Sequence, residues 1–227
     1  MNDNSSPAHL KTPPGRLLNG AVTRMWTLLA PAYDLPFLQQ WVYRPPHDEM
    51  IAALRAHGSR RIADIGCGTG ILSDRIRREL QPDEAYGVDM SVGMLEQARA
   101  RTDAVRWLRA PAEHLPFDNG ALDAVVTTSA FHFFDQPSAL AEFHRVLANG
   151  GLVGVAALST RQPMLQAFSA SRWKPQHNTS PAEMRHLFQS AGFTVTDQHR
   201  IARPLWMRIV ADLITVGTKN SADLKLS

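Results

Sequence analysis

From residue 60 onward, short apolar runs alternate with longer stretches that mix apolar and polar residues. The apolar runs predict strands at residues 61–65, 84–89, 105–110, 122–128 and 152–158. The stretches between them predict helices at residues 70–80, 91–101 and 136–149. Because strands that alternate with helices form parallel sheets covered on both faces, this rhythm predicts an α/β fold.

The last third of the chain departs from this rhythm. Residues 159–180 have no clean period and are interpreted as an insertion of helix and loop. The next segment predicts a helix with clear end signals, which are Ser180 as N-cap, Pro181 at N1, Glu183 at N3 and Gly192 just past the last turn.

Two strand-like runs follow, at residues 194–201 and 209–219. They lie too close together for a crossover helix, so they predict an antiparallel hairpin. The fold expected for the whole chain is therefore a mostly parallel, seven-stranded, Rossmann-like sheet, with helices on both faces and an antiparallel hairpin at its C-terminal end.

The N-terminal part precedes the first strand and differs in character. Residues 1–16 are polar and Pro-rich, which predicts a disordered tail, and residues 17–227 then form a single domain. Within residues 17–58 we expect two helices, one broken before Pro31 and one that starts at Pro45 and Pro46 and stops at Gly58.

Composition and charge narrow the classes of function. The net charge is +3 with interspersed acidic and basic residues, so nucleic acid is an unlikely partner. No apolar run reaches the roughly 18 residues of a transmembrane helix, and no signal peptide is visible, which predicts a cytoplasmic protein. Cys67 is the only cysteine, so the chain has no internal disulfide and no cysteine metal cluster.

A glycine-rich turn, "ADIGCGTG", follows the first predicted strand. Its glycines permit positive φ and let the backbone approach a ligand at the carboxyl end of the strand. A dinucleotide fingerprint would need a glycine at Ile71, and no Walker lysine follows. Asp64 lies two residues before the first glycine and could accept a hydrogen bond from an ammonium group, whereas it would repel a diphosphate. The turn therefore favours a cationic ligand over NAD or ATP.

A second carboxylate, Asp89, falls at the end of the next predicted strand. A carboxylate there can accept hydrogen bonds from both hydroxyls of a ribose. Met90 follows it and could pack against an adenine face. Together with the turn, these residues predict a site for a nucleoside with a cationic tail.

Four pieces, in this order and spacing, resemble the class I S-adenosylmethionine-dependent methyltransferases. They are "ADIGCGTG", "GVDMSVGML", "APAEHLPFDNGALDAVV" and "FHRVLANGG", and they lie between residues 60 and 154. The chain is most similar to the small-molecule branch that includes the ubiquinone/menaquinone-type enzymes. The resemblance implies transfer of a methyl group from S-adenosylmethionine to a small acceptor, with S-adenosylhomocysteine as the product.

The resemblance also implies residue roles. The cofactor would contact Asp64, Gly66, Cys67, Gly68, Thr69, Gly70, Asp89, Met90, Met94, Ala112, Glu113, Thr128 and Ser129. The first six would hold the methionine end, Asp89 the ribose, and Ala112 and Glu113 would flank the adenine. Where the family commonly has an Asp that accepts from the adenine amino group, this chain has Pro111. That bond is therefore missing or is supplied by another group such as Glu113.

The chemistry requires an acceptor aligned with the methyl group, and a general base only where the attacking atom carries a proton. Thr128, Ser129, Phe131 and His132 would face the methyl group, with His132 as the candidate base or else a packing residue. Three other histidines, His47, His144 and His186, fall on predicted helices and are expected at the surface. Asp123 and Cys67 are expected to have structural roles.

The acceptor pocket is expected to come from residues 17–58, a helical lid, and from the insertion at 159–180. By the resemblance, Tyr33 would close over the cofactor. The aromatic residues Trp26, Phe37, Trp41, Phe168, Trp173 and Trp206 suit an apolar or aromatic acceptor, although ordinary core packing is the more frequent role for any one of them alone. The end of the fourth strand carries no carboxylates, so no metal is expected.

Three alternatives stay open at this point. The chain could methylate a phospholipid or a tRNA, it could be a non-catalytic S-adenosylmethionine-binding regulator, or it could be an NAD-dependent oxidoreductase. We expect a monomer or homodimer that acts on a small-molecule acceptor.

Overall fold

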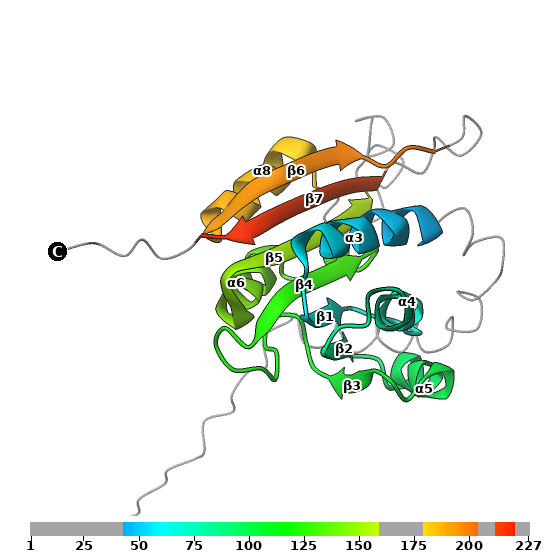
Figure 1. Ribbon diagram of the computed structural model, residues 1–227. Helices are drawn as coiled ribbons and strands as arrows, with labels where there is room; N and C mark the ends of the chain where they lie inside the picture. Colours follow the sequence, from blue (N-terminus) through cyan, green and yellow to red (C-terminus); the bar gives the residue numbers. More distant parts are fainter. Residues whose placement is uncertain (1–42, 159–178, 204–211, 221–227) are drawn as a thin grey trace, which may run out of the picture.

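A computed structural model describes residues 43–158, 179–203 and 212–220 of the chain. These residues form a seven-stranded sheet in the order β3-β2-β1-β4-β5-β7-β6 (Figure 1). The strands are β1 (Arg61–Ile65), β2 (Glu84–Asp89), β3 (Arg106–Arg109), β4 (Leu122–Thr128), β5 (Leu147–Leu158), β6 (Phe193–Arg200) and β7 (Asp212–Lys219). The helices are α3 (Arg44–His57), α4 (Ile71–Leu80), α5 (Val92–Arg101), the short 3-10 helix η2 (Phe131–Phe133), α6 (Gln136–Val146) and α8 (Pro181–Ser190).

The antiparallel direction is confined to β7. It runs antiparallel to β5 on one side and to β6 on the other, so β6 has the same direction as the first five strands. The predicted C-terminal hairpin is thereby confirmed, with β7 inserted between β5 and β6. Sheet order and strand directions confirm the Rossmann-like methyltransferase fold.

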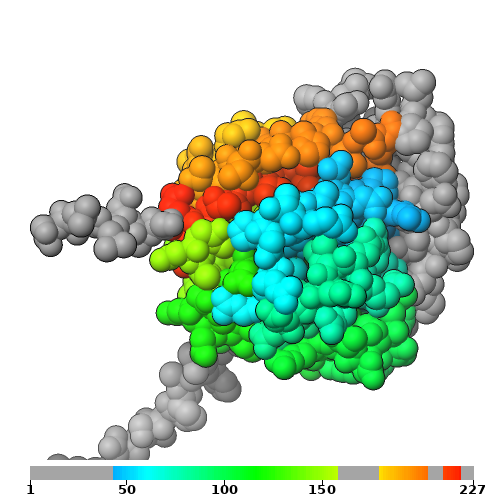
Figure 2. Space-filling view, viewed as in Figure 1, coloured from blue at the N-terminus to red at the C-terminus, as the bar shows by residue number. Residues whose placement is uncertain are grey.

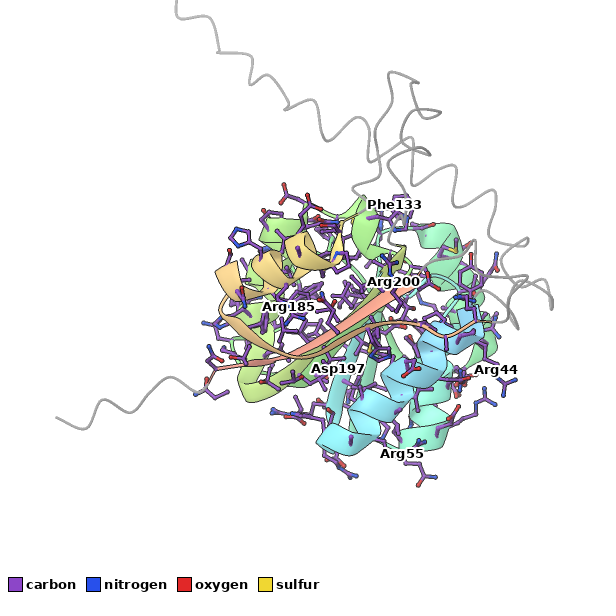
Figure 3. All side chains as sticks on the ribbon, turned by 90° about the horizontal axis from the view of Figure 1, so that it is seen from above. Arg44, Arg55, Phe133, Arg185, Asp197 and Arg200 are labelled. Atoms are coloured by element: carbon purple, nitrogen blue, oxygen red, sulfur yellow. The ribbon has the colours of Figure 1, made fainter. Side chains whose placement is uncertain are left out.

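Helices cover both faces of the sheet. Figure 3 shows the sheet from above, between α8, which carries Arg185, and α3, which carries Arg44 and Arg55. Alternate residues of the strands point to opposite faces of the sheet and contribute to two separate hydrophobic cores. Ala63, Ile65 and Val125 pack on the side of α6 and α8, whereas Ile62, Ala124 and Val126 pack on the side of α3 and α4. Figure 2 shows α3 lying across the surface on its side of the sheet.

Helix ends follow the local signals closely. α3 begins with Pro45 and Pro46 in its first turn and ends at Gly58 in a left-handed conformation (φ 72°). Before α8, Ser180 and Glu183 form a reciprocal capping box. These predictions are confirmed, because such ends depend on only a few neighbouring residues.

The boundary between α6 and β5 was predicted wrongly. The sequence indicated a helix to residue 149 and a strand from residue 152, but α6 ends at Val146 and β5 begins at Leu147. Leu147 is fully buried and pairs with Leu122 across the sheet. Lys219 also donates hydrogen bonds of 2.8 Å to the carbonyl oxygens of His144 and Leu147. Contacts between segments distant in sequence therefore override the local helical pattern at this point.

Several expectations lie outside the described residues. These are the tail at 1–16, the first helix of the proposed lid, the insertion at 159–178 and the side chains of Tyr33, Trp26, Phe37, Trp41, Phe168, Trp173 and Trp206. Among the helices that the structure describes, none has both the length and the apolar character needed to cross a bilayer.

Candidate active site

A cavity of about 220 Å³ lies at the carboxyl ends of β1, β2 and β4. In Figure 1 these strand ends lie toward the right, on the side where α3 begins. Its wall combines the glycine turn after β1, the end of β2, the loop after β3, the segment after β4 and the start of α3. Twelve of the thirteen residues predicted to contact a cofactor line it, namely Asp64, Gly66, Cys67, Gly68, Thr69, Asp89, Met90, Met94, Ala112, Glu113, Thr128 and Ser129.

Only one of the three turn glycines has open space where a side chain would be. All three have positive φ, which favours glycine. A Cβ on Gly66 would collide with Ala130, and one on Gly70 would collide with the ring of Trp107. A Cβ on Gly68 would meet only the sulfur of Met94, at 4.0 Å. Gly68 is therefore the position where a ligand can approach the backbone closely.

Gly70 is the one predicted cofactor contact that does not line the cavity. It starts α4 with φ 79°, and Trp107 and Ala98 occupy the space next to its Cα. Gly70 therefore allows close packing of α4 against β3 and α5, and its expected contact with the ligand stays a prediction.

Asp64 lies on β1 and its carboxylate faces the side of the sheet that carries α4. The side chain is 2% exposed and accepts a 2.7 Å hydrogen bond from the hydroxyl of Ser73. Burial raises the pKa of Asp64 to about 7, the negative charge of Asp89 adds to this rise, and the Ser73 hydrogen bonds oppose it. A cation in the cavity would stabilise the ionised form of this carboxylate.

Asp89 is held at the end of β2 by the backbone of the turn and of α5. Its carboxylate accepts hydrogen bonds from the amide of Gly68 at 3.0 Å and from the amide of Ser91 at 2.8 Å. Burial raises its pKa, and these backbone hydrogen bonds oppose the rise. The carboxylate is thus fixed at the cavity wall next to the open face of Gly68.

The loop after β3 forms the wall beside Met90. Glu113 lines the cavity, but one of its oxygens accepts a 2.8 Å hydrogen bond from the backbone amide of Asp135. Pro111 and Ala112 also line the cavity. The family commonly has an Asp at the position of Pro111, which accepts a hydrogen bond from the adenine amino group. That Glu113 takes over this role here therefore stays a prediction.

Two residues of α6 hold this loop in place. Glu142 accepts a 2.6 Å hydrogen bond from the amide of Leu115 and pairs with Arg145 at 2.7 Å. Arg145 in turn donates to the carbonyl oxygens of Phe117 and Leu115 at 2.9 and 3.2 Å. The cavity wall at Ala112 and Glu113 is therefore tied to the helix behind it.

The segment after β4 turns sharply, and the turn decides which side chains reach the cavity. Ser129 adopts φ 56°, an uncommon conformation for a residue with a side chain, and lines the cavity. Phe133, labelled in Figure 3, also lines it. Phe131 and His132 do not, because η2 directs them into the protein interior, where they are 0% and 6% exposed.

His132 was the candidate base, and its position argues against that role. Its side chain is not part of the cavity wall, where an acceptor would bind. Its ring packs 4.0 Å from that of Phe133, centroid to centroid. The packing interpretation that the sequence left open is the one that fits this geometry.

Sequence reasoning missed several residues of the cavity wall, among them Tyr43 and His47 at the start of α3 and Phe133 and Phe134 after β4. His47 was expected at the surface but is 6% exposed. The signal was present in the helical spacing, because His47 shares one face of α3 with the buried residues Met50, Ile51 and Leu54. Of the other helix histidines, His186 is exposed as expected, whereas His144 is half-buried against Phe193.

Of the two residues expected to be structural, Asp123 has such a role in the described structure. Asp123 accepts hydrogen bonds from the backbone amides of Arg60 and Arg61 at 3.1 and 2.8 Å, which ties the start of β1 to β4. Burial raises the pKa of the Cys67 thiol well above its ordinary value, which disfavours the reactive thiolate. The described part of the chain holds no group of three or more side chains arranged to bind a metal ion.

The family model and the relatives that match this chain all point to one family. Residues 62–151 match the family model described as "Methyltransferase domain". The chain is 29% identical to the ubiquinone/menaquinone biosynthesis C-methyltransferase UbiE of Campylobacter jejuni, over 62% of this chain and 65% of that protein. It is 31% identical to the malonyl-[acyl-carrier protein] O-methyltransferase of Hahella chejuensis, over 65% of this chain and 53% of that protein. Thus the chain spans less than two thirds of the length of these two relatives.

A third relative is matched over more of its length. The 2-phytyl-1,4-naphtoquinone methyltransferase of Nostoc punctiforme is 31% identical over 66% of this chain and 70% of that protein.

Solved structures agree on the fold. One chain of the Haloferax volcanii complex between the Trm112 methyltransferase activator and a methyltransferase superposes with a TM-score of 0.69 at 23% identity, over 86% of this chain and 98% of that one. The YcgJ protein of Bacillus subtilis superposes with a TM-score of 0.65 at 19% identity, over 79% of this chain and all of that one. Fold, cavity and relatives together show that this chain belongs to the class I S-adenosylmethionine-dependent methyltransferases, in the branch that includes the ubiquinone/menaquinone-type enzymes.

Proposed function

We propose that this protein transfers a methyl group from S-adenosylmethionine to a small, lipophilic or aromatic acceptor, at oxygen or carbon. The observation that carries the proposal is the open face of Gly68, which lines the same cavity as the carboxylates of Asp64 and Asp89 on the neighbouring strands β1 and β2. A cationic amino-acid tail suits Asp64, and a ribose suits Asp89. A diphosphate would meet two negative charges here.

The residues present fit the cofactor along its whole length. Asp64 and the turn at Gly68 would hold the methionine end, Asp89 would accept hydrogen bonds from the ribose hydroxyls, and Met90 and Ala112 would enclose the adenine. When bound, S-adenosylmethionine supplies an electrophilic methyl group on a positively charged sulfur. The protein then has to align the acceptor and exclude water, since positioning supplies much of the rate enhancement in such a reaction.

The acceptor class is supported by the cavity wall and by the relatives. Beside the strand ends the wall is apolar, with Ile71, Leu72, Ala130, Phe133 and Phe134. Two of the matched relatives are named for quinone compounds and one for an acyl-carrier O-methylation. This supports a small organic acceptor and leaves both carbon and oxygen as candidate positions. A monomer or homodimer in the cytoplasm stays a prediction.

Calorimetric titration of the full chain with S-adenosylhomocysteine and with NADH tests the cofactor. We expect micromolar or tighter binding of S-adenosylhomocysteine and none of NADH, and the reverse result would refute the proposal. Methyl-labelled S-adenosylmethionine, incubated with a panel of phenols, hydroquinones and phospholipids, then tests catalysis. Binding without transfer to any acceptor in the panel would favour the non-catalytic regulator.

A further inference from the structure

His47 is a buried histidine that the cofactor roles above leave unused. It lies in the first turns of α3, is 6% exposed, and lines the cavity. Helix α3 packs against β4, β5, β7 and α4, so its first turns border the β4 side of the cavity. The imidazole is therefore part of the wall through the docking of this helix.

Within the described residues, the imidazole of His47 has no hydrogen-bond partner, and its low pKa keeps it uncharged at neutral pH. Among residues 43–158, 179–203 and 212–220, no group forms a hydrogen bond with it. Burial and the nearby guanidinium of Arg75 lower the pKa of His47 to about 3, and the carboxylate of Asp48 opposes this shift. Buried polar groups are nearly always hydrogen-bonded, so an unpartnered imidazole on a cavity wall indicates a position where a ligand completes the bond.

The sheet order places His47 on the acceptor side. Asp89, Met90, Ala112 and Glu113 stand at the end of β2 and in the loop after β3, where the adenosine would lie. β1 separates β2 from β4 in the sheet, Thr128 ends β4, and α3, which carries His47, packs against β4, β5 and β7 as well as α4. The turn at the end of β1 would carry the methionine end, so the packing of α3 favours the region beyond that turn for His47.

No other side chain of the described wall offers the same chemistry. The carboxylates of Asp64, Asp89 and Glu113 are already held by Ser73, by backbone amides of the turn and α5, and by Asp135. The remaining wall side chains are apolar, thiol or hydroxyl groups, and a neutral nitrogen base is found there only in His47.

From this arrangement, and resting on the proposed function, we propose that His47 binds a hydroxyl group of the acceptor and takes its proton during methyl transfer. A neutral imidazole suits this role because it does not repel the positively charged sulfonium. The acceptor would accordingly be an alcohol, phenol or hydroquinone, with the hydroxyl on or conjugated to the methylated atom.

The step is balanced. An electron pair of the oxygen, or of a ring carbon conjugated with it, forms the new bond to the methyl carbon. The carbon–sulfur bond breaks and its pair stays on the sulfur as a neutral thioether. The hydroxyl proton moves to the free nitrogen of His47, so one positive charge passes from sulfur to imidazole.

A weak base suffices, because the hydroxyl becomes strongly acidic as its oxygen gives up electron density. The low pKa of the imidazole then favours release of this proton to solvent. At a ring carbon, the proton on that carbon then leaves and the oxygen takes up a proton, so that aromaticity and the hydroxyl group both return and one proton is released in total.

A pair of probes isolates the hydroxyl contact. 1-Naphthol and naphthalene, which differ by one hydroxyl, are titrated into the full chain saturated with S-adenosylhomocysteine. We expect the wild-type protein to bind 1-naphthol about 5- to 10-fold more tightly than naphthalene, because this is the gain in affinity that one additional hydrogen bond typically provides. In His47→Ala this preference disappears, whereas His47→Gln, whose amide oxygen still accepts a hydrogen bond, retains part of it. His186→Ala, an exposed histidine of α8, serves as the matched control and keeps the full preference.

Spectroscopy provides a second readout. With ¹⁵N-labelled histidine, 1-naphthol should shift the His47 ring nitrogen resonances and naphthalene should not. Equal affinity of wild-type protein for both probes, or an unchanged preference in His47→Ala, would overturn the inference. So would a more than tenfold loss of S-adenosylhomocysteine affinity in His47→Ala with the preference intact, which would assign the residue to the cofactor. Failure of the wild-type protein to bind S-adenosylhomocysteine would instead refute the proposed function itself.

Discussion

Ser73 of α4 donates a 2.7 Å hydrogen bond to the buried carboxylate of Asp64 on β1. This contact orients the carboxylate and lowers its pKa, but burial outweighs it and raises the pKa of Asp64 to about 7. The carboxylate therefore changes charge in the physiological range and responds to the charge of whatever occupies the cavity.

Cofactor affinity should depend on pH through Asp64. A ligand ammonium group favours the ionised carboxylate, so below pH 7 binding has to expel a proton from Asp64. We expect the affinity for S-adenosylhomocysteine to rise with pH, by up to about tenfold per pH unit between 5.5 and 7, and to level off above 7. Calorimetry across pH 5.5–8 measures this. The same titration of Asp64→Asn should be weak and flat, and an equally steep curve in that variant would contradict the assignment.

The same carboxylate should reduce the stability of the ligand-free protein. Because its pKa is about 7 in the folded state and 3.8 ordinarily, the folded state holds an extra proton between these values, and stability falls as pH rises through that window. At pH 8 Asp64→Asn should therefore be more stable than wild type by about 1 kcal/mol or more, and this gain should shrink at pH 5. Thermal unfolding at both pH values tests this, with the exposed Asp103→Asn as control. A variant less stable than wild type at pH 8 would show that the carboxylate is structurally required.

Alanine substitutions in the glycine turn should distinguish a glycine that is needed for ligand binding from one that is needed for packing. In Gly68→Ala the new methyl group enters open space, so we expect at least a tenfold loss of S-adenosylhomocysteine affinity and a folded protein. In Gly70→Ala the methyl group collides with Trp107, so we expect about 1–3 kcal/mol of destabilisation beyond the backbone strain.

Gly58→Ala is the matched control for both. Gly58 also has positive φ (72°), and no other group lies within 4 Å of the added methyl. It therefore reports the backbone strain alone, about 1–2 kcal/mol. The interpretation of the turn fails if Gly70→Ala is no less stable than Gly58→Ala, or if Gly68→Ala binds as wild type does.

Glu142 should support the cavity wall from behind. Its replacement by Ala leaves the amide of Leu115 and the guanidinium of Arg145 without their carboxylate, which should cost about 1–3 kcal/mol. Hydrogen exchange at the Leu115 amide should accelerate, and cofactor affinity should fall by a smaller factor. Unfolding curves and exchange rates measure both effects. The exposed Glu96→Ala is the control, and equal stability of the two variants would show that the contact contributes nothing.

Much of the fold could be predicted because its signals are local. The strands at 61–65, 84–89 and 122–128 have the predicted bounds, and the caps at Gly58 and Ser180 are as expected. The α6–β5 boundary could not be predicted, since pairing of Leu147 with Leu122 overrides the local helical pattern.

The sequence alone determined the alternation of strands and helices, the glycine turn and the two carboxylates at the ends of β1 and β2, because each depends on a few neighbouring residues. Only the tertiary structure decided which side chains face the cavity. The sharp turn at Ser129 buries His132 in the interior, and the docking of α3 on the sheet brings His47 to the wall. Side-chain direction after a tight turn, and the face that a helix presents to a neighbour, depend on packing between segments far apart in the chain.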